Sequence, residues 1–301
     1  MKIIAVVVTF NRFELLKKTI SCLRATPQLN AIVVVNNDST DGTAAWLDNQ
    51  QDLTVIHQQN VGGAGGFQTG MKRAYTMGAD WIWCMDDDVF PRPDCLEHLL
   101  RHTAEPKVGI MSPRRLVEGA IFTTEFKDYD LTHTLASTSI APLRKISVEE
   151  TTEIAGAAFE GLFISRKVVE TIGYPNPDLF IFYDDTDYCI RAYRTGFKLL
   201  YVPDALMDKQ KFFAGNTWIE RTSKKRWKRF YQVRNGAWFA STYGRTWGVK
   251  YVRPFIAMLG YLFPAAVMGP LGRGYRPADA LRFIKAYREG LQGNLGKIKW
   301  L

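Results

Sequence analysis

Cysteine is scarce in this sequence and poorly placed for metal or disulfide chemistry. The 301 residues include four cysteines, and no two of them form a C-x-x-C pair. Without that spacing, a zinc site and a disulfide framework are both disfavoured, and buried thiols are the simpler interpretation. The four residues are Cys22, Cys84, Cys95 and Cys189.

Long apolar runs are also scarce. Residues 1–12 have too short an apolar run for a secretory signal and no small-residue cleavage site, so we expect a cytoplasmic protein. The apolar segment 255–268 contains Pro264 and lies between Pro254 and Pro270. Because proline interrupts a helix, we expect this segment to lie in a membrane interface rather than to span the bilayer.

Acidic residues are scarce in the last third of the chain. Residues 208–301 contain 19 lysines and arginines but four aspartates and glutamates, whereas residues 1–207 contain 20 and 26. We therefore predict two parts, 1–207 and a basic, aromatic, mainly helical C-terminal region at 208–301. Such a region can bind nucleic acid or an anionic membrane, or it can be a solvated surface.

The first part alternates between strand and helix patterns. Residues 3–8 and 31–35 are continuous, largely β-branched runs typical of strands buried on both faces. Further strands are predicted at 53–57 and 80–85, and helices at 13–23, 43–50, 69–77 and 94–103. This alternation predicts an α/β fold in which a mostly parallel sheet is flanked by helices.

Polar segments follow all four predicted strands, at the edge where open parallel sheets bind ligands. They are residues 9–12, 36–42, 60–67 and 86–88. The third segment is rich in glycine but lacks the motifs of a P-loop and of a dinucleotide site. Phosphate binding and a tight connection therefore both stay open for it.

Three adjacent aspartates make up the fourth segment. At the end of a strand, Asp86 and Asp88 can point the same way, and their oxygens suit Mg²⁺ or Mn²⁺. The alternative is a solvated acidic turn that caps the next helix. The position of the aspartates after the apolar run 81–85 favours the metal site.

Five motifs, taken in order, resemble those of the family 2 glycosyltransferases. They are VVTFNR (7–12), VVNNDSTDGT (34–43), NVGGAGGF (60–67), WCMDDDV (83–89) and FIFYDDTDYCIR (180–191). The resemblance covers residues 3–240 and implies the nucleotide-sugar-binding GT-A fold. The glycine-rich third motif and the doubled aspartate of the fifth look most like bacterial galactofuranosyltransferases, and rhamnosyltransferases share much of the same frame.

The resemblance implies how residues 1–207 bind their donor, a UDP-sugar. Asp86 and Asp88 would ligate a divalent cation, Mn²⁺ or Mg²⁺, that carries the diphosphate. The residues expected around the nucleotide are Thr9, Phe10, Arg12, Asp38, Asn60 and Asp87. A metal suits this chemistry because negative charge develops on the departing nucleoside diphosphate.

A second acidic cluster, residues 183–187, precedes a predicted helix. The resemblance makes Asp185 the general base, with Asp184 beside it as a catalytic and acceptor-binding residue. A base is needed because a sugar hydroxyl is a poor nucleophile until its proton is removed. The alternative is that Asp184, Asp185 and Asp187 cap the helix. Upstream, Glu160 lies in a segment that resembles the acceptor side of the family's cleft.

One position departs from the family pattern. Relatives commonly carry a histidine metal ligand where this chain has Asp208 and Lys209. A protonated lysine cannot ligate a metal, although its charge could meet the diphosphate directly. We therefore expect Asp208 to serve as the substitute metal ligand.

The segment YQVRN (231–235) resembles a motif that follows the family's catalytic domain. The family's acceptors are often lipid-linked glycans on the cytoplasmic leaflet. Among the three interpretations of the basic region, this resemblance favours a membrane surface, and we expect no nucleic-acid partner. The expected location is cytoplasmic and peripheral, on the inner face of the cell membrane.

These features predict a metal-dependent, inverting glycosyltransferase of cell-surface glycan biosynthesis, for example of O-antigen. The expected reaction moves galactofuranose from UDP-galactofuranose to a polysaccharide or a lipid-linked oligosaccharide. Inversion follows because a single base drives direct displacement at the anomeric carbon. The alternatives are a rhamnosyltransferase that uses dTDP-rhamnose, a nucleotidyltransferase, and a nucleic-acid-binding basic module.

Overall fold

The chain folds into two compact units, as seen in a computed structural model. It describes residues 1–122, 129–136, 149–211 and 217–301. The first unit draws on residues 1–128, 139–177 and 184–211, and the second on residues 129–138, 178–183 and 212–301. The charge pattern placed the division near residue 208. The structure places it after residue 211 and gives two short segments of the front half to the second unit.

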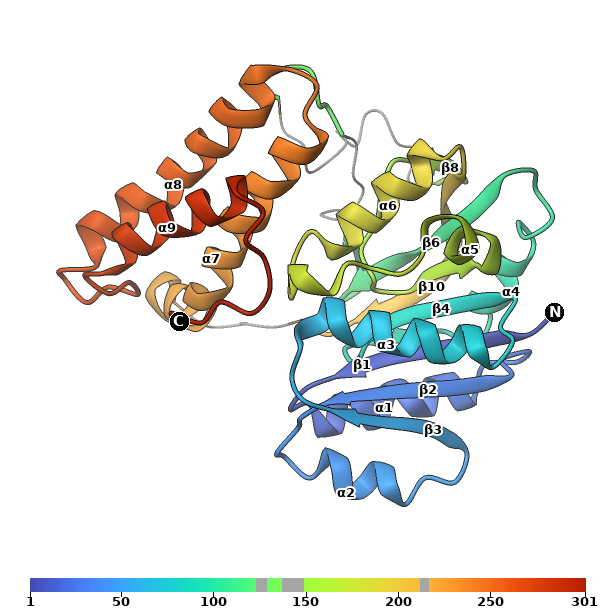
Figure 1. The fold of residues 1–301 in the computed structure, drawn as a ribbon. Coiled ribbons are helices and arrows are strands. Elements are labelled where there is room, and N and C mark those ends of the chain that lie inside the picture. Colours follow the sequence, from blue (N-terminus) through green and yellow to red (C-terminus); the bar gives the residue numbers. More distant parts are fainter. Residues whose placement is uncertain (123–128, 137–148, 212–216) are drawn as a thin grey trace. The chain divides into compact units, whose positions relative to one another are not determined.

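The described residues of the first unit form one ten-stranded sheet. The first four strands are β1 (Ile3–Thr9), β2 (Ala31–Asn37), β3 (Leu53–Gln58) and β4 (Trp81–Asp86). The others are β5 (Val89–Pro91), β6 (Val108–Val117), β7 (Ala120–Ile121), β8 (Thr152–Ile154), β9 (Leu162–Ser165) and β10 (Lys198–Lys209). Their order is β3-β2-β1-β4-β9-β6-β10-β5, with β7 beside β6 and β8 beside β10. Figure 1 shows β3, β2, β1 and β4 side by side.

The first four strands are parallel, as predicted. The later strands are mixed, because β6 and β10 are parallel but β9 runs antiparallel to both β4 and β6. Leu162 at the start of β9 therefore pairs with Cys84 near the end of β4. This pairing brings the residues just before β9 to the edge of the sheet where the acidic triplet lies.

Apolar side chains fill both faces of the sheet. One face is covered by α1 (Phe13–Arg24), α2 (Thr43–Asp48) and α4 (Cys95–Leu100), and the other by α3 (Gly62–Thr76), α5 (Arg166–Ile172) and α6 (Asp184–Arg194). In β1, Val7 packs on the first face and Val8 on the second. Since successive strand residues point to opposite faces, a sheet covered on both sides requires the uninterrupted apolar run seen in the sequence.

The glycine-rich motif is helical, which corrects the prediction that it forms a loop and that the helix begins near residue 69. Helix α3 starts at Gly62, whose amide donates to Asn60 Oδ1 over 3.0 Å. A Cβ atom on Gly66 would lie 2.5 Å from Val8 Cγ1 and 2.9 Å from Asn37 Nδ2. Glycine is therefore required for close packing of α3 on the sheet, and this outweighs its low helix propensity.

The second unit is helical, as predicted for the C-terminal region. Its helices are α7 (Trp218–Tyr243), the π-helical turn η3 (Gly248–Val252), α8 (Arg253–Met268) and α9 (Asp279–Leu291). A 3₁₀ turn, η2 (Pro177–Leu179), begins at the last residue of a first-unit segment and continues into residues 178–183 of the second unit. Phe230, Met258 and Phe283 belong to its core. Pro264 lies inside α8 without ending it.

The motif YQVRN has a structural role within the second unit. Asn235 is fully buried, and its side-chain amide donates to the carbonyl oxygens of Leu179, Ile181 and Phe182 over 2.8, 2.9 and 3.0 Å. The same short segment holds Phe180 and Phe182 at φ of 63° and 65°. Such left-handed backbone is unfavourable for phenylalanine, so the buried hydrogen bonds help to hold the segment in place.

Candidate active site

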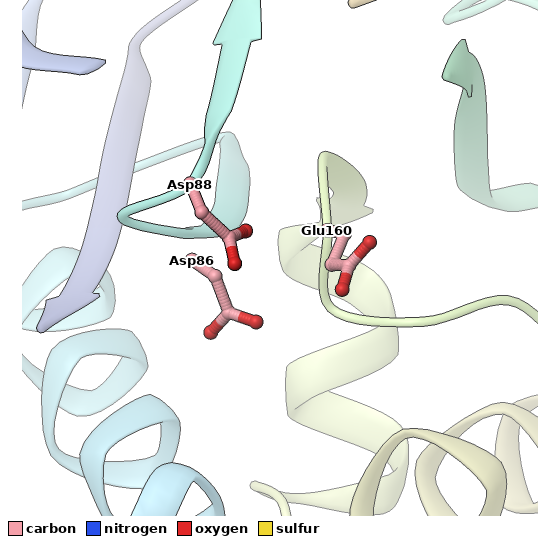
Figure 2. A group of neighbouring side chains, drawn as sticks. All are labelled: Asp86, Asp88 and Glu160. Carbon is pink, nitrogen blue, oxygen red and sulfur yellow. The ribbon is translucent and has the colours of Figure 1, made fainter. Parts of the chain in front are cut away.

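The acidic triplet lies in the turn between β4 and β5. Asp86 ends β4, in register with Val8 of β1, and Asp88 immediately precedes β5. Figure 2 shows that both side chains point toward Glu160. Ligand oxygens of these three carboxylates lie within 4.8 Å of one another. The structure thus brings the predicted pair together and adds a third carboxylate.

Glu160 reaches the triplet because of the antiparallel strand β9. Gly161 N donates to Cys84 O over 2.9 Å, which places Glu160 opposite the end of β4. The sequence assigned Glu160 to the acceptor side of a cleft. Its position beside Asp86 and Asp88 depends on strand pairing between residues far apart in the chain, which no local pattern indicates.

The cluster concentrates negative charge at a partly buried place, where Asp88 is buried and Asp86 and Glu160 are half-buried. Burial raises the pKa of Asp86 well above its usual range, and the charges of Asp88, Glu160 and Asp87 raise it further. Lys209 opposes this shift. Neighbouring carboxylates that disfavour one another's ionised form are stabilised by a positive partner.

Two basic residues contact Glu160, the buried Arg115 and the partly buried Lys209. Lys209 Nζ lies 2.6 Å from Glu160 Oε1 and 3.6 Å from Asp88 Oδ1, and Arg115 donates to Glu160 Oε2 over 3.2 Å. Arg115 of β6 pairs in register with Met207 of β10, two residues before Lys209, so both basic residues lie on the same face of the sheet. Sequence reasoning missed Arg115, since nothing in its local pattern marks it as a site residue.

Asp208 lies on the opposite face of β10 from Lys209. Its carboxylate accepts hydrogen bonds from Arg92, with distances of 3.2 and 3.0 Å, and it is half exposed. The structure therefore does not bring Asp208 into the carboxylate cluster. The reason is the two-residue period of a strand, which lets only one of two adjacent residues face the site.

Asp87 is held by Thr9, which ends β1, and by Arg12, which follows it. Thr9 Oγ1 donates to Asp87 Oδ2 over 2.6 Å, and one Arg12 nitrogen lies 3.2 Å from Asp87 Oδ1 and 2.5 Å from Asp88 Oδ2. Burial raises the pKa of Asp87 to about 6, against the opposing effects of the Arg12 charge and the Thr9 hydrogen bond. These contacts fix the turn that carries the cluster.

The other residues expected around the nucleotide lie at the ends of neighbouring strands. Phe10 follows β1 and is 46% exposed, and Asp38 follows β2, also exposed, with a φ of 67°. Asn60 precedes α3 and is half-buried. Because β1, β2 and β3 are parallel and adjacent, these side chains come from one edge of the sheet, as the sequence predicted.

The second acidic cluster forms the first turn of α6. Asp184 is buried, and Asp185 Oδ1 accepts hydrogen bonds from the Thr186 amide and hydroxyl over 2.5 and 2.9 Å. Asp187 pairs with Arg191 over 2.9 Å. Burial lowers the pKa of Arg115, and Glu160, Asp185 and Asp86 oppose this shift, so Arg115 is electrostatically coupled to both acidic clusters.

The first cluster fits a divalent cation. Three carboxylates offer the hard oxygen ligands that Mg²⁺ and Mn²⁺ prefer. Asp88 is 5% exposed, and its Oδ1 atom accepts no hydrogen bond from the described residues. Buried oxygens normally have such a donor, so an additional cation would complete an otherwise unsatisfied site.

A family model described as Glycosyl transferase family 2 matches residues 4–173, which is more than half of the chain. The chain belongs to glycosyl transferase family 2. The matched range includes the whole carboxylate cluster. The resemblance predicted from the five motifs is confirmed, and the protein is a glycosyltransferase.

Two named relatives cover most of this family 2 chain. Galactofuranosyltransferase GlfT1 of Mycolicibacterium smegmatis is 25% identical over 262 residues, which is 80% of this chain and 83% of the relative. The dTDP-rhamnosyl transferase RfbF of Shigella flexneri is 27% identical over 251 residues, 77% and 78% of the two chains. Its relatives therefore include a galactofuranosyltransferase and a rhamnosyltransferase, the two kinds of enzyme that its motifs resemble.

A solved structure shows the fold of this family 2 glycosyltransferase. The mannosyltransferase PcManGT from Pyrobaculum calidifontis, in complex with GDP-Man and Mn²⁺, matches with a TM-score of 0.56 at 16% identity. The match covers 97% of this chain and 87% of the other. The predicted α/β, GT-A fold with a helical C-terminal region is confirmed.

Proposed function

We propose that this glycosyltransferase moves galactofuranose from UDP-galactofuranose, with inversion, to a polysaccharide or a lipid-linked oligosaccharide of the cell surface. The partly buried cluster of Asp86, Asp88 and Glu160 at this edge of the sheet carries the proposal of a metal-bound nucleotide sugar. The likeness to galactofuranosyltransferase GlfT1 over 80% of the chain supports the sugar.

Asp86, Asp88 and Glu160 would hold Mn²⁺ or Mg²⁺. When bound, the cation stabilises the negative charge that develops on the departing diphosphate. Glu160 takes the place that the sequence gave to Asp208, because Asp208 pairs with Arg92 on the other face of β10. Thr9, Arg12 and Asp87 position the turn, and Phe10, Asp38 and Asn60 contribute to nucleotide binding.

Asp185 removes the proton of the acceptor hydroxyl, and Asp184 beside it binds the acceptor. The hydroxyl oxygen attacks the anomeric carbon as the bond to the diphosphate breaks, so the configuration inverts. The hydrogen bonds that Asp185 receives from Thr186 fix the orientation of its carboxylate. Capping of α6 by the same acidic turn is compatible with this role.

A panel of donors tests the proposed reaction. The protein is incubated with UDP-galactofuranose, dTDP-rhamnose and other nucleotide sugars, with and without Mn²⁺, and the released nucleoside diphosphate is measured. We expect metal-dependent release from UDP-galactofuranose. Preferential use of dTDP-rhamnose would identify the rhamnosyltransferase alternative, for which the likeness to RfbF argues. Release of pyrophosphate would instead identify a nucleotidyltransferase.

We also propose that the second unit binds the cytoplasmic face of the membrane through α8. By length and composition, Gly248–Met268 could cross a membrane, with a mean hydropathy of 1.4 and 17% of its apolar window buried. Phe255, Phe263 and Val267 on this helix are exposed by 44 to 61%. Since Pro264 interrupts its hydrogen bonding and 19 basic residues lie in region 208–301, we favour a helix in the plane of an anionic leaflet.

Liposome sedimentation of the full chain tests this membrane role. We expect binding to anionic vesicles that weakens with salt, and a large loss of binding when Phe263→Glu and Val267→Glu are combined. Leu281→Glu, at an exposed leucine of α9, is the control for added negative charge. Equal binding by all variants, or salt-sensitive binding to DNA with none to vesicles, would contradict the proposal.

A further inference from the structure

Lys209 occupies the side of the carboxylate cluster that the two arginines leave open. Arg12 contacts Asp88 Oδ2 and Arg115 contacts Glu160 Oε2, whereas Lys209 faces the other oxygen of each carboxylate. A cation that bridges Asp88 and Glu160 through these remaining oxygens must therefore share them with the Lys209 ammonium.

The backbone of Lys209 cannot move away from the cluster without loss of pairing. Lys209 pairs with Val89 of β5, and the next amide, of Gln210, donates to Asp88 O over 2.9 Å. Its side chain, in contrast, has a flexible four-carbon stem, and its ammonium lies 5.5 Å from the centre of the Phe122 ring. The Lys209 ammonium therefore stays near the site, and rotation of its side chain can bring it to another anionic group.

We propose that Lys209 competes with the divalent cation for Asp88 and Glu160, and that a nucleoside diphosphate relieves this competition by offering its own oxygens to the ammonium. Two positive charges a few ångströms apart repel, and the repulsion falls when phosphate charge is added beside them. Metal and nucleotide therefore bind cooperatively, each increasing the affinity for the other by the same factor. This inference rests on the proposed function of the cluster as a nucleotide-sugar and metal site.

Manganese binding without turnover tests the competition. Free Mn²⁺ is measured by its electron paramagnetic resonance signal, with and without UDP, for the wild type and for Lys209→Met. In the wild type, we expect UDP to tighten Mn²⁺ binding by a factor within the roughly 5- to 150-fold range of typical coupling. Lys209→Met should bind Mn²⁺ at least about tenfold more tightly without UDP, and UDP should then tighten Mn²⁺ binding by a smaller factor than in the wild type, because the attraction between metal and diphosphate remains.

Matched variants control for charge and for folding. Lys209→Arg keeps a positive charge at the site and should retain the wild-type coupling. Lys211→Met removes a neighbouring lysine that pairs with the exposed Glu118, and it should also behave as the wild type. Lys209→Gln, checked by circular dichroism, repeats the test if Lys209→Met does not fold.

The outcomes separate this inference from the proposed function. If the wild type binds Mn²⁺ and UDP together but a folded Lys209→Met or Lys209→Gln variant keeps its affinities and its coupling, the competition is disproved and the metal site stands. If the wild type binds no Mn²⁺ even with UDP, the proposed metal site fails together with the inference. Tighter Mn²⁺ binding in Lys209→Met and unchanged binding in Lys211→Met support it.

Discussion

Two buried aspartates, one in each unit, differ in how their carboxylate oxygens are hydrogen-bonded. Asp279 in the second unit is fully buried, and its oxygens accept hydrogen bonds from Arg226, Arg282 and the Arg276 amide over 2.9, 3.3 and 2.7 Å. Asp88 in the first unit is nearly as buried, yet its Oδ1 atom accepts no hydrogen bond from the described residues. A satisfied buried carboxylate stabilises a fold, whereas a crowded, unsatisfied one is better suited to bind a cation.

Asp185 could be a catalytic base or a structural carboxylate, because its hydrogen bonds from Thr186 would also suit a structural role like that of Asp279. Asp185→Asn keeps the size and the acceptor oxygen but removes the base. If the base is catalytic, we expect a loss of about 10²- to 10⁴-fold in kcat with little change in UDP affinity. Initial rates with saturating donor measure it. A variant that loses UDP affinity alone would move Asp185 into the nucleotide site.

Asp279→Ala should harm stability and spare the site. Removal of this carboxylate leaves Arg226, whose side chain is 15% exposed, without its partner, and breaking a buried ion pair costs about 3 kcal/mol. Urea denaturation measures the loss in the free energy of unfolding. Mn²⁺ and UDP affinities at low denaturant should equal those of the wild type, and a parallel loss of binding would show that the two regions are not independent.

Asp88→Ala should harm metal binding and largely spare stability. Loss of a direct ligand should weaken Mn²⁺ binding by more than the about 100-fold that supporting residues can cost. Without metal, the free energy of unfolding should fall less than in Asp279→Ala, because Arg12 keeps its ion pair with Asp87 and one of the charges that disfavour ionised Asp86 is removed. Metal titration measures the Mn²⁺ affinity, and urea denaturation measures the free energy of unfolding. A loss of stability as large as that of Asp279→Ala would contradict the difference between a structural Asp279 and a metal-binding Asp88.

A glycine pair in α3 tests how the sheet edge is held. Gly66→Ala would place a Cβ against Val8 and Asn37, and such overpacking costs about 1–3 kcal/mol. Gly63→Ala, in the same helix with open space around it, should stabilise the protein by up to about 1 kcal/mol through helix propensity. Opposite shifts in the urea midpoint are expected, and equal shifts would refute the packing explanation.

The sequence by itself determined the parallel half of the sheet and the place of the acidic triplet. Uninterrupted apolar runs such as 3–8 and 31–35 are explained only by strands buried on both faces, and polar residues after parallel strands must gather at one edge. These are local patterns with a fixed period, so they can be read without contacts. The family followed from the order of motifs along the same edge.

Only the tertiary structure decided which charges meet the triplet. Glu160 reaches Asp86 through the antiparallel pairing of β9, and Arg115 and Lys209 arrive on one face through the register of β6 and β10. A shift of one residue in β10 would have presented Asp208 instead of Lys209. Since register depends on packing across the whole sheet, a pattern confined to neighbouring residues does not specify whether a carboxylate or an ammonium faces the site.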